Sequence, residues 1–347
     1  MKKLRAMLRK IYMLFAGEHE RSDYVVQYVK YYWARLFGKK SYVRQSWNGT
    51  QKSNSKDVAV FVHFDPNGII HDFVLHYLVE LAKAGRRIVF VTNSPKFPKS
   101  ERKKLDGLVS SILWRRNKGY DFGAYADGIK SLGDLNQLDS LLICNDSVYG
   151  PVFGLKELFK KMPAEQADIW ALTDSWDTRY HLQSYFLLFH KNAIRHQFFT
   201  KRWQNYVHVH SKSWVIRKHE IGLSMEARKA GLRTRSLYRY RDQLARFIKK
   251  VGNASILEDK SLSPAHRNVL TQIFEHAENS APLNASHFFW DQLLLSGYPF
   301  IKREVLQGNP MGLPSLYKWQ QLLEEISDYD TELINDHLEE IMRGRFI

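Results

Sequence analysis

The sequence predicts an α/β fold in which helices flank a parallel or mixed sheet. Two observations lead to this prediction: short runs of β-branched and aromatic residues alternate with segments of helical period, and the joints between them are short. The segment 58–64 (VAVFVHF) is almost continuously apolar, as is typical of a buried strand, and 88–92 (IVFVT) repeats the pattern. Because a helical segment separates them, these two strands are expected to lie parallel in one sheet.

The other elements follow in order along the chain. Phe73, Leu78 and Leu81 recur at helical spacing within 70–84, and Gly85 follows as a helix stop. The alternation continues to residue 190, and from Phe198 onwards the chain is expected to be mainly helical. Strands are predicted at 58–64, 88–92, 112–115, 140–144, 168–173 and 183–190, and helices at 70–84, 99–107 and 123–132.

Charge and polarity divide the chain into three predicted parts. Its 347 residues carry 52 Lys and Arg against 36 Asp and Glu, a net charge of +16 that favours polyanionic partners: nucleic acid, anionic lipid or phosphorylated substrates. Of these, 13 cations and 4 acids lie in the first 57 residues. We expect 1–56 to be a basic amphipathic extension ending in a polar linker at 41–56, 57–232 to be the α/β core, and 233–347 to be a basic segment and a helical region.

The N-terminal extension carries an apolar stripe. Leu4, Leu8, Ile11 and Phe15 recur at spacings that place them on one side of a helix. Such a stripe is typical of a surface helix packed on the domain, and equally of an interfacial helix on the anionic cytoplasmic leaflet of a membrane. Since no uncharged apolar run is long enough to span a bilayer, we expect a cytoplasmic protein that is peripheral on the inner face of the cell membrane.

Polar side chains stand where four successive predicted strands end. His63 and Asp65 follow the first strand, and Thr92 and Asn93 follow the second. The third strand runs into RRNKGYDFGAYADGI and the fourth into ICNDSVYGP. Ligands of open α/β sheets bind beyond the carboxyl ends of the strands, so these residues predict one shared crevice. At a single strand end the same residues are typical of an ordinary turn, but four in succession favour a ligand site.

Several well-known motifs are absent. The sequence has no GxxxxGK[ST] phosphate loop, no GxSxG nucleophile elbow and no HExxH zinc motif, and its glycines lack dinucleotide-binding spacing. The single cysteine, Cys144, excludes an internal disulfide framework and a cysteine-based zinc cage, and is expected in the core. His208 and His210 alternate as on a strand without neighbouring carboxylates, which predicts surface positions.

The loops and strands together resemble those of inverting glycosyltransferases of the A type, whose mixed sheet is Rossmann-like. In such enzymes the loop corresponding to 116–119 (RNKG) and its helix lie beside a nucleotide-sugar, and an acidic metal motif stands where this chain has 145–147 (NDS). Six segments from about residue 58 to 310 resemble more specifically the rhamnan synthesis protein F family of bacterial polysaccharide glycosyltransferases. These segments are RNKGYDFGAYADGI, LLICNDSVYGP, DIWALTDS, HLQSYFLLF, HEIGLS and HFFWDQLLLSGYPFIKREVLQGNP.

This resemblance implies an inverting glycosyltransferase, a rhamnosyltransferase in particular, acting in the synthesis of lipopolysaccharide O-antigen, rhamnan or capsule. It implies dTDP-L-rhamnose or another nucleotide-sugar as donor, bound by 57–232, and a glycan or lipid-linked acceptor, whose side of the site 233–347 completes. Together with the strand ends described above, it leads us to expect these residues at the donor: His63, Asp65, Thr92, Asn93, Arg116, Asn117, Gly119, Asp121 and Asn145.

The leaving diphosphate gains negative charge that the protein has to neutralise. Asp146 could hold Mg²⁺ or Mn²⁺ there, but Asn145 and Ser147 replace the acidic neighbours usual in the resembling enzymes. The alternative is neutralisation by basic side chains, helped by the N-terminus of the helix at 123–132. The basic candidates are Arg115, Arg116, Lys118 and Lys302.

A general base must remove the proton from the acceptor hydroxyl. Glu220 is the candidate, because the resembling enzymes place an acidic residue at the opening of a helix in a comparable segment; a helix-opening residue stabilised by the dipole is the alternative. Asp174 is the second catalytic candidate, with Asp177 in reserve. The residues expected to contact the acceptor are His181, Gln183 and Trp176.

Two other functions stay open. The basic segment 233–250, in which tyrosines lie between arginines, would suit a non-catalytic nucleic-acid-binding protein, although no nucleic-acid module is legible and nucleic acid is therefore not the expected partner. A sugar-phosphate transferase could use the same crevice, and it would release a nucleoside monophosphate instead of a diphosphate.

Overall fold

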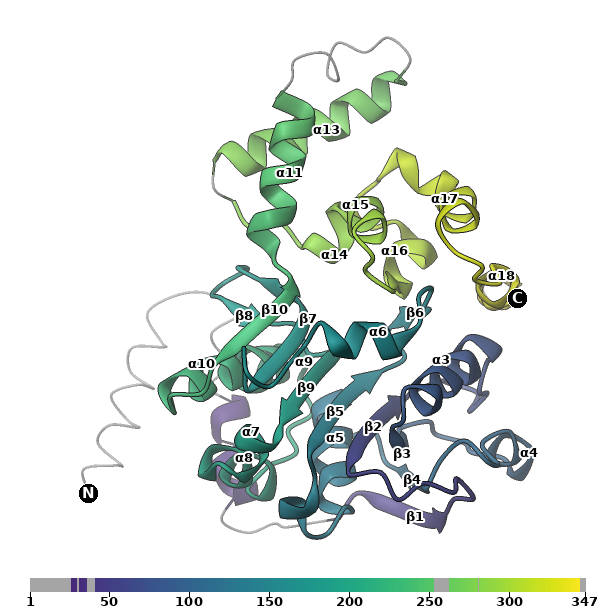
Figure 1. The fold of residues 1–347 in the computed structure, drawn as a ribbon, viewed down its shortest axis with the longest axis vertical. Coiled ribbons are helices and arrows are strands. Elements are labelled where there is room, and N and C mark those ends of the chain that lie inside the picture. Colours follow the sequence, from purple (N-terminus) through teal and green to yellow (C-terminus); the bar gives the residue numbers. More distant parts are fainter. Residues whose placement is uncertain (1–25, 30, 36–40, 253–261, 280, 344–347) are drawn as a thin grey trace.

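A computed structural model describes residues 26–29, 31–35, 41–252, 262–279 and 281–343 (Figure 1). The predicted N-terminal stripe lies outside these residues. Residues 26–29 and 31–35 are helical, and the rings of Tyr28 and Tyr31 lie 5.9 and 5.3 Å from the ring of Trp214. On the same segment Trp33 is 64% exposed. Among the described helices, none has the length and apolar character needed to cross a bilayer.

A nine-stranded mixed sheet forms the centre of the fold, with its longest path in the order β1-β4-β3-β2-β5-β9-β7-β10. β3, β2 and β5 are mutually parallel, as are β7 and β10, whereas β1 and β9 run antiparallel to their neighbours. This mixed α/β architecture confirms the predicted fold class. The strands are β1 (Val43–Asn48), β2 (Asp57–His63), β3 (Arg87–Thr92), β4 (Ser111–Arg115), β5 (Ser140–Asn145), β7 (Ile169–Ser175), β9 (Phe186–His190) and β10 (Thr234–Tyr238), with β8 (His181–Leu182) paired to β7.

Helices cover both faces of the sheet, because alternate residues of each central strand point into two separate apolar cores. Phe61 and Phe90 belong to the core beneath α3, whereas Val60 and Val91 belong to the core beneath α5. The helices of this part are α3 (Asp72–Lys83), α4 (Lys99–Lys103), α5 (Tyr120–Lys130), α6 (Leu155–Lys160), α7 (Lys191–Arg195), α8 (Gln197–Gln204), α9 (Lys212–Trp214) and α10 (Gly222–Lys229).

Two segments differ from the prediction. The polar stretch predicted as a linker contains β1, which pairs with β4 and packs the ring of Trp47 6.1 Å from Phe97. The basic segment predicted to interrupt the helical region begins with β10, which extends the sheet beside β7. Both are edge strands with polar outward-facing side chains, and their apolar residues are too few to stand out as buried strands.

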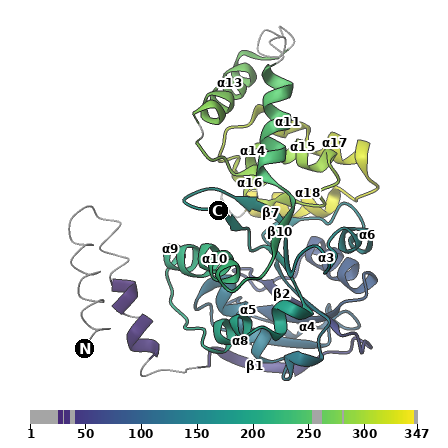
Figure 2. The ribbon, with the colours of Figure 1, turned by 60° about the vertical axis from the view of Figure 1, so that its left-hand side comes forward.

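The C-terminal region packs on the core that contains α3 (Figures 1 and 2). Its helices are α11 (Tyr240–Gly252), α13 (Pro264–Glu278), α14 (Ala285–Phe288), α15 (Trp290–Leu295), α16 (Arg303–Gly308), α17 (Trp319–Ile326) and α18 (Glu332–Arg343). Both views show α11 and α13 side by side, extending away from the sheet.

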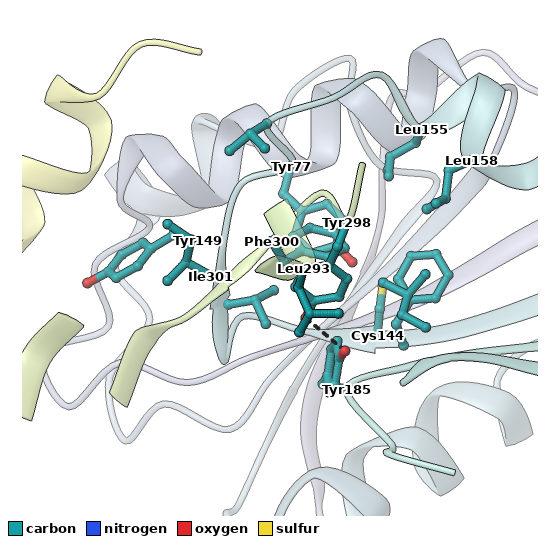
Figure 3. Close-up of a cluster of buried hydrophobic side chains, with 14 of the residues drawn as sticks. Tyr77, Cys144, Tyr149, Leu155, Leu158, Tyr185, Leu293, Tyr298, Phe300 and Ile301 are labelled. Carbon is teal, nitrogen blue, oxygen red and sulfur yellow. Dashed lines mark hydrogen bonds between the residues drawn. The ribbon is translucent and has the colours of Figure 1, made fainter. Parts of the chain in front are cut away.

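One short strand fastens this region to the sheet. β11 (Ile301–Lys302) pairs antiparallel with β6 (Val148–Tyr149), which follows β5 directly. Just before β11, the Tyr298 hydroxyl donates to the Tyr185 hydroxyl at 2.8 Å, and Tyr298 and Phe300 pack near Tyr77 and Cys144 (Figure 3). The C-terminal region is therefore held at the carboxyl edge of β5.

Gly128 tests how closely α5 approaches the sheet. A Cβ at this position would lie 2.5 Å from Val60 Cγ1 and 3.0 Å from Val91 Cγ2. Replacement of a helical glycine by alanine normally stabilises a helix, but here the clash outweighs that gain. We expect Gly128→Ala to lower the free energy of unfolding by about 1–3 kcal/mol in urea denaturation.

Gly154→Ala is the matched control, because no atom of the described residues, its two chain neighbours apart, lies within 4 Å of the Cβ that it adds. Its stability should stay within about 0.5 kcal/mol of the parent protein. Equal stability of the two variants would contradict the close packing of α5.

Candidate active site

His63 and Thr92, at the ends of β2 and β3, form one end of the site. His63 Nδ1 lies 3.1 Å from Thr92 Oγ1, and its Nε2 lies 3.1 Å from the carbonyl oxygen of Ile69. Because a carbonyl only accepts, the imidazole donates from Nε2. Burial lowers the pKa of His63, although the nearby carboxylates of Asp146 and Asp65 oppose this effect. The ring is therefore a neutral hydrogen-bonding group.

Asp65 holds the loop that follows β2. Its Oδ1 accepts from the backbone N–H groups of Asn67 and Ile69 at 2.8 and 2.9 Å, and His71 Nε2 lies 3.4 Å from Oδ2. Burial would raise the pKa of Asp65, but these hydrogen bonds outweigh burial and lower it to about 2. The carboxylate thus has a clear structural role beside the role at the donor that the sequence predicted.

Arg115 is fully buried and binds three elements together. Its guanidinium donates from Nε to Asp127 Oδ2 at 2.7 Å, from Nη1 to Asn93 Oδ1 at 2.6 Å and from Nη2 to the carbonyl oxygen of Lys118 at 2.8 Å. The prediction that Arg115 neutralises a diphosphate is wrong, since these partners already use its charge. Arg116 and Lys118 are exposed.

The same buried carboxylate contacts a histidine that was expected at the surface. His208 Nε2 lies 3.2 Å from Asp127 Oδ1, and the His208 side chain is only 7% exposed. The expectation was wrong because Asp127 is distant in the sequence and meets His208 only in the fold. Beside this pair, the 206–208 segment packs on the loop before α5, where the Tyr206 hydroxyl lies 3.4 Å from the Gly119 carbonyl oxygen.

Residues 117 to 121 lead into α5. Gly119 has φ +80° and precedes the first residue of the helix, a backbone conformation that an L side chain rarely adopts. The amide oxygen of Asn117 is buried and has no hydrogen-bond partner among the residues that the structure describes. Asp121, in the first turn, accepts from Asn145 Nδ2 at 2.8 Å, which joins α5 to the end of β5.

Asp121 has a strongly altered acidity. Burial and the nearby Asp146 carboxylate raise its pKa to about 6, while the hydrogen bond from Asn145 opposes this rise. Asn145 in turn accepts from the Ser147 hydroxyl at 2.7 Å. A carboxyl group with a pKa near 6, held in the first turn of a helix against the end of a central strand, is typical of a functional site.

Asp146 pairs with Arg303, a residue that the sequence analysis missed. Arg303 Nη1 lies 3.3 Å from Asp146 Oδ2 and donates to the Asp146 carbonyl oxygen at 2.9 Å, while Oδ2 also accepts from the Phe64 N–H at 3.2 Å. The two residues are 157 positions apart, so no local pattern could reveal the pair.

The described donor set does not fit a divalent metal. Asp146 is already neutralised by Arg303, and Asn145 bonds to Asp121 and Ser147. In the part of the chain that the structure describes, no three or more His, Cys, Asp or Glu side chains group as metal ligands.

Lys302 places a second cation beside these carboxylates. Its Nζ lies 3.3 Å from the Ser147 hydroxyl and 3.8 Å from the centre of the Tyr185 ring. Burial lowers the pKa of Lys302 to about 8, although Glu304, Glu220 and Asp121 act in the opposite direction. The ammonium group of this half-buried side chain is thus charged at neutral pH.

Glu220 lies on a π-helical segment, Val215–Ile221. Its Oε1 accepts from both the backbone N–H and the hydroxyl of Ser184, each at 2.8 Å. The expected helix-opening position of Glu220 is therefore wrong, since the residue precedes α10 within a continuous helical run. π-Helical turns are frequent at functional sites because they re-aim a side chain within a helix.

Asp174, the second catalytic candidate, and the three residues predicted for the acceptor do not all line one cavity. Asp174 accepts from the Tyr240 N–H at 2.6 Å and lines, together with Trp176, a cavity of about 580 Å³ that neither Glu220 nor Asp121 lines. Gln183 Oε1 accepts from the Thr173 hydroxyl at 2.5 Å. His181 Nδ1 lies 2.8 Å from the Arg179 carbonyl oxygen, inside the hairpin of β7 and β8.

Fold and site together define an α/β protein with a cluster of polar, titratable side chains at the carboxyl edge of its sheet, where a distant segment adds two cations. The family model described as "Rhamnan synthesis protein F" matches residues 88–253. The virulence protein VirA of Vibrio anguillarum is 31% identical over 238 residues, which cover 65% of this chain and 73% of VirA. The chain belongs to the rhamnan synthesis protein F family.

Other similarities are more distant. The uncharacterized protein y4gN of Sinorhizobium fredii is 31% identical over 202 residues, 57% of this chain and 52% of that protein. Among solved structures, the galactosyltransferase LgtC with donor and acceptor sugar analogues has a TM-score of 0.35 at 10% identity, covering 80% of this chain and 99% of LgtC. The mannosyltransferase Ktr4p of S. cerevisiae with GDP has a TM-score of 0.28 at 8% identity, covering 58% of this chain and 75% of Ktr4p. At these scores no residue role is carried over.

The raised pKa of Asp121 has a consequence for stability. Because its pKa is about 6 in the fold and 3.8 otherwise, the folded state binds the proton more tightly, and stability falls as pH rises through that window. Above pH 6, where the carboxyl group is ionised in both states, the destabilisation by Asp121 stays constant. Asp121→Asn, which can still accept from Asn145, should raise the free energy of unfolding at pH 7 by about 1–3 kcal/mol in urea denaturation.

Asp168→Asn is the matched control with the opposite sign. Hydrogen bonds from Arg233 and Asn192 lower the pKa of Asp168 to about 2, although burial opposes them. Its charged form therefore stabilises the fold above pH 4, and this stability is lost as pH falls towards 2. The control variant should be less stable at pH 7. If Asp121→Asn were also less stable, the acidity assigned to Asp121 would be wrong.

Proposed function

We propose that this protein is a glycosyltransferase that moves a sugar from a nucleotide-diphosphate donor to a glycan or lipid-linked acceptor. The observation that carries the proposal is the meeting of Asp121, Asn145, Lys302 and Glu220 at one edge of the sheet, from four distant parts of the chain. Membership of the rhamnan synthesis protein F family supports this chemistry. The family name also favours rhamnose as the sugar and cell-surface polysaccharide as the product.

The donor would lie between the ends of β2, β3 and β5. The loop before α5 and the polar groups of His63 and Thr92 would contact the nucleotide part. Lys302 would neutralise charge that develops on the leaving diphosphate, because a cation in a poorly solvated site acts more strongly than one in water. Arg303 contributes through Asp146, whose charge it balances.

Glu220 would be the general base. The Ser184 N–H and hydroxyl both hold Oε1, which fixes the carboxylate in one orientation. Transfer of rhamnose from a β-linked donor to an α-linked product inverts the anomeric carbon, so a single base suffices and no covalent intermediate forms. The bond from the anomeric carbon to the diphosphate breaks, the bond to the acceptor oxygen forms, and the carboxylate takes the proton.

The remaining parts of the proposal concern place and partners. A lipid-linked acceptor would bring the protein to the inner face of the cell membrane, and the basic N-terminal region favours an anionic surface. The sugar-phosphate transferase alternative keeps the same crevice and differs in the leaving group. The nucleic-acid alternative rests on the basic charge alone.

A panel of nucleotide-sugars tests the donor and the metal together. We expect at least one nucleoside diphosphate sugar, dTDP-L-rhamnose first, to raise the melting temperature by a few degrees through linkage. Because Arg303 already balances Asp146, the rise should be the same in excess EDTA and in Mn²⁺. It should shrink between pH 7 and 9 as Lys302, with its pKa near 8, loses its proton.

Lys302→Met provides the internal comparison for this panel. The nucleotide-sugar should raise the melting temperature of this variant less, and by an amount that no longer depends on pH between 7 and 9. A shift that requires Mn²⁺ would contradict the cationic mode. Release of nucleoside monophosphate during turnover would favour the sugar-phosphate transferase instead.

Glu220→Gln tests the general base. Turnover should fall by roughly 10²–10⁴-fold, because the amide keeps the geometry but cannot take a proton. Circular dichroism and nucleotide-sugar binding should be unchanged. The matched control is Glu157→Gln, an exposed glutamate that pairs with Lys160 on α6 and should leave turnover as it is. Near-normal turnover of the Glu220 variant would remove this residue from the mechanism.

A further inference from the structure

Two adjoining cavities surround the edge strand β10. One has a volume of about 580 Å³ and the other about 440 Å³, and both are lined by Trp176, Tyr180 and Thr234. We name the two cavities together the β10 groove. The larger cavity is lined by residues of both β10 and α11, and β10 is the last strand on the path of the sheet and leads into α11 (Figure 1). Its combined size suits an oligosaccharide of a few rings.

Aromatic rings form the middle of the β10 groove. The Trp176 side chain is 37% exposed, and its ring lies 5.2 Å from that of Tyr180 in an edge-to-face arrangement. Partly exposed aromatic rings offer an apolar face on which the C–H face of a sugar ring can pack. Such a pair is a common way to hold a saccharide without a deep pocket.

Cationic side chains dominate the walls. Six cations and two carboxylates line the two cavities. Arg241 lies 4.6 Å above the Trp176 ring and Arg228 lies 5.3 Å above the Tyr180 ring. An aromatic ring orients a guanidinium but does not neutralise it, so both charges remain available to an anionic ligand. The cations are Lys161, Arg228, Arg233, Arg235, Arg239 and Arg241.

A buried carboxylate in the β10 groove favours a ligand that can donate hydrogen bonds. Asp174 is 5% exposed, lines the larger cavity and accepts from the Tyr240 N–H. A carboxylate accepts hydrogen bonds from hydroxyl groups and repels phosphates that have none to offer. The β10 groove therefore matches a ligand with both hydroxyl donors and acidic groups, which an acidic sugar has and a DNA backbone lacks.

One hairpin carries both a wall of the β10 groove and the residue that holds Glu220. Asp174 pairs with Leu182 across β7 and β8, and Ser184, which holds Glu220, follows two residues later. A chain of sugar rings in the groove would therefore lie along the same hairpin as the general base.

We propose that the β10 groove binds an oligosaccharide that carries carboxylate or phosphate groups, as the acceptor of the reaction proposed above. The role of this oligosaccharide as the acceptor rests on the proposed function, whereas its binding to the β10 groove does not. The sugar rings pack on Trp176, the acidic groups pair with Arg241 and Arg228, and hydroxyl groups donate to Asp174.

Calorimetric titration of the whole chain without any donor tests the binding alone. The probes are trigalacturonate for the carboxylate arm, pentamannose phosphate for the phosphate arm and maltotriose as the neutral trisaccharide. We expect at least one acidic probe to bind at least tenfold more tightly than maltotriose at 50 mM NaCl, and more weakly at 200 mM NaCl. The arm that binds identifies the acidic group.

Variants distinguish binding in the β10 groove from attraction by the overall positive charge of the protein. Trp176→Ala and Arg241→Gln should each weaken the acidic probe at least tenfold. Lys249→Gln removes an exposed cation from the same helix, α11, and Tyr317→Ala removes an aromatic ring that is 77% exposed elsewhere; both should leave binding unchanged.

Three results would overturn the inference: no binding of either acidic probe, equal binding of maltotriose, or tighter binding of a twelve-nucleotide thymidine strand that Arg241→Gln abolishes. The last would make the groove a nucleic-acid site. Because no donor is present, a negative result here leaves the nucleotide-sugar panel untouched, and failure of that panel leaves acidic-sugar binding in place.

Discussion

The candidate site depends on the short pairing of β6 with β11. Two residue pairs, Ile301 with Tyr149 and Lys302 with Val148, bring a segment from the last sixth of the chain to the end of the central strand β5. The hydrogen bond between Tyr298 and Tyr185 and the apolar packing around it hold that segment in place. Without this contact the carboxylates at the sheet edge would face no cation from the C-terminal region.

Several carboxylates of like charge lie close together at this edge of the sheet. Asp121, Asp146 and Glu220 lie close enough to influence one another, and only Asp146 has an ion-pair partner among the described residues. The acid Asp121 and the base Lys302 both have pKa values moved towards neutrality, because burial favours the uncharged form of each. A fold selected for stability alone would avoid such groups, so their retention points to a ligand that completes the charge balance.

Local sequence patterns were sufficient for the central sheet but not for its edges or its ion pairs. The buried strands around His63 and Thr92 are apolar runs, and their polar ends meet as expected. The strand VRQSWN is too polar to be recognised, because an edge strand buries little of its surface. The partners of Asp146 and His208 could not be found either, since those contacts join residues far apart and depend on the tertiary fold. From the sequence alone Arg115 resembles a phosphate-binding cation, because its burial is visible only in the fold.

Cys144 gives the molecule a practical property. It is the only cysteine of the chain, it is fully buried in β5 beside Tyr77, and burial raises the pKa of its thiol (Figure 3). Thiol reagents act on the thiolate, so the native protein should stay unmodified by maleimides while folded. A single cysteine introduced on an exposed position of α11 would then be the one labelled site, and spectroscopic probes could report on that helix in an otherwise native chain.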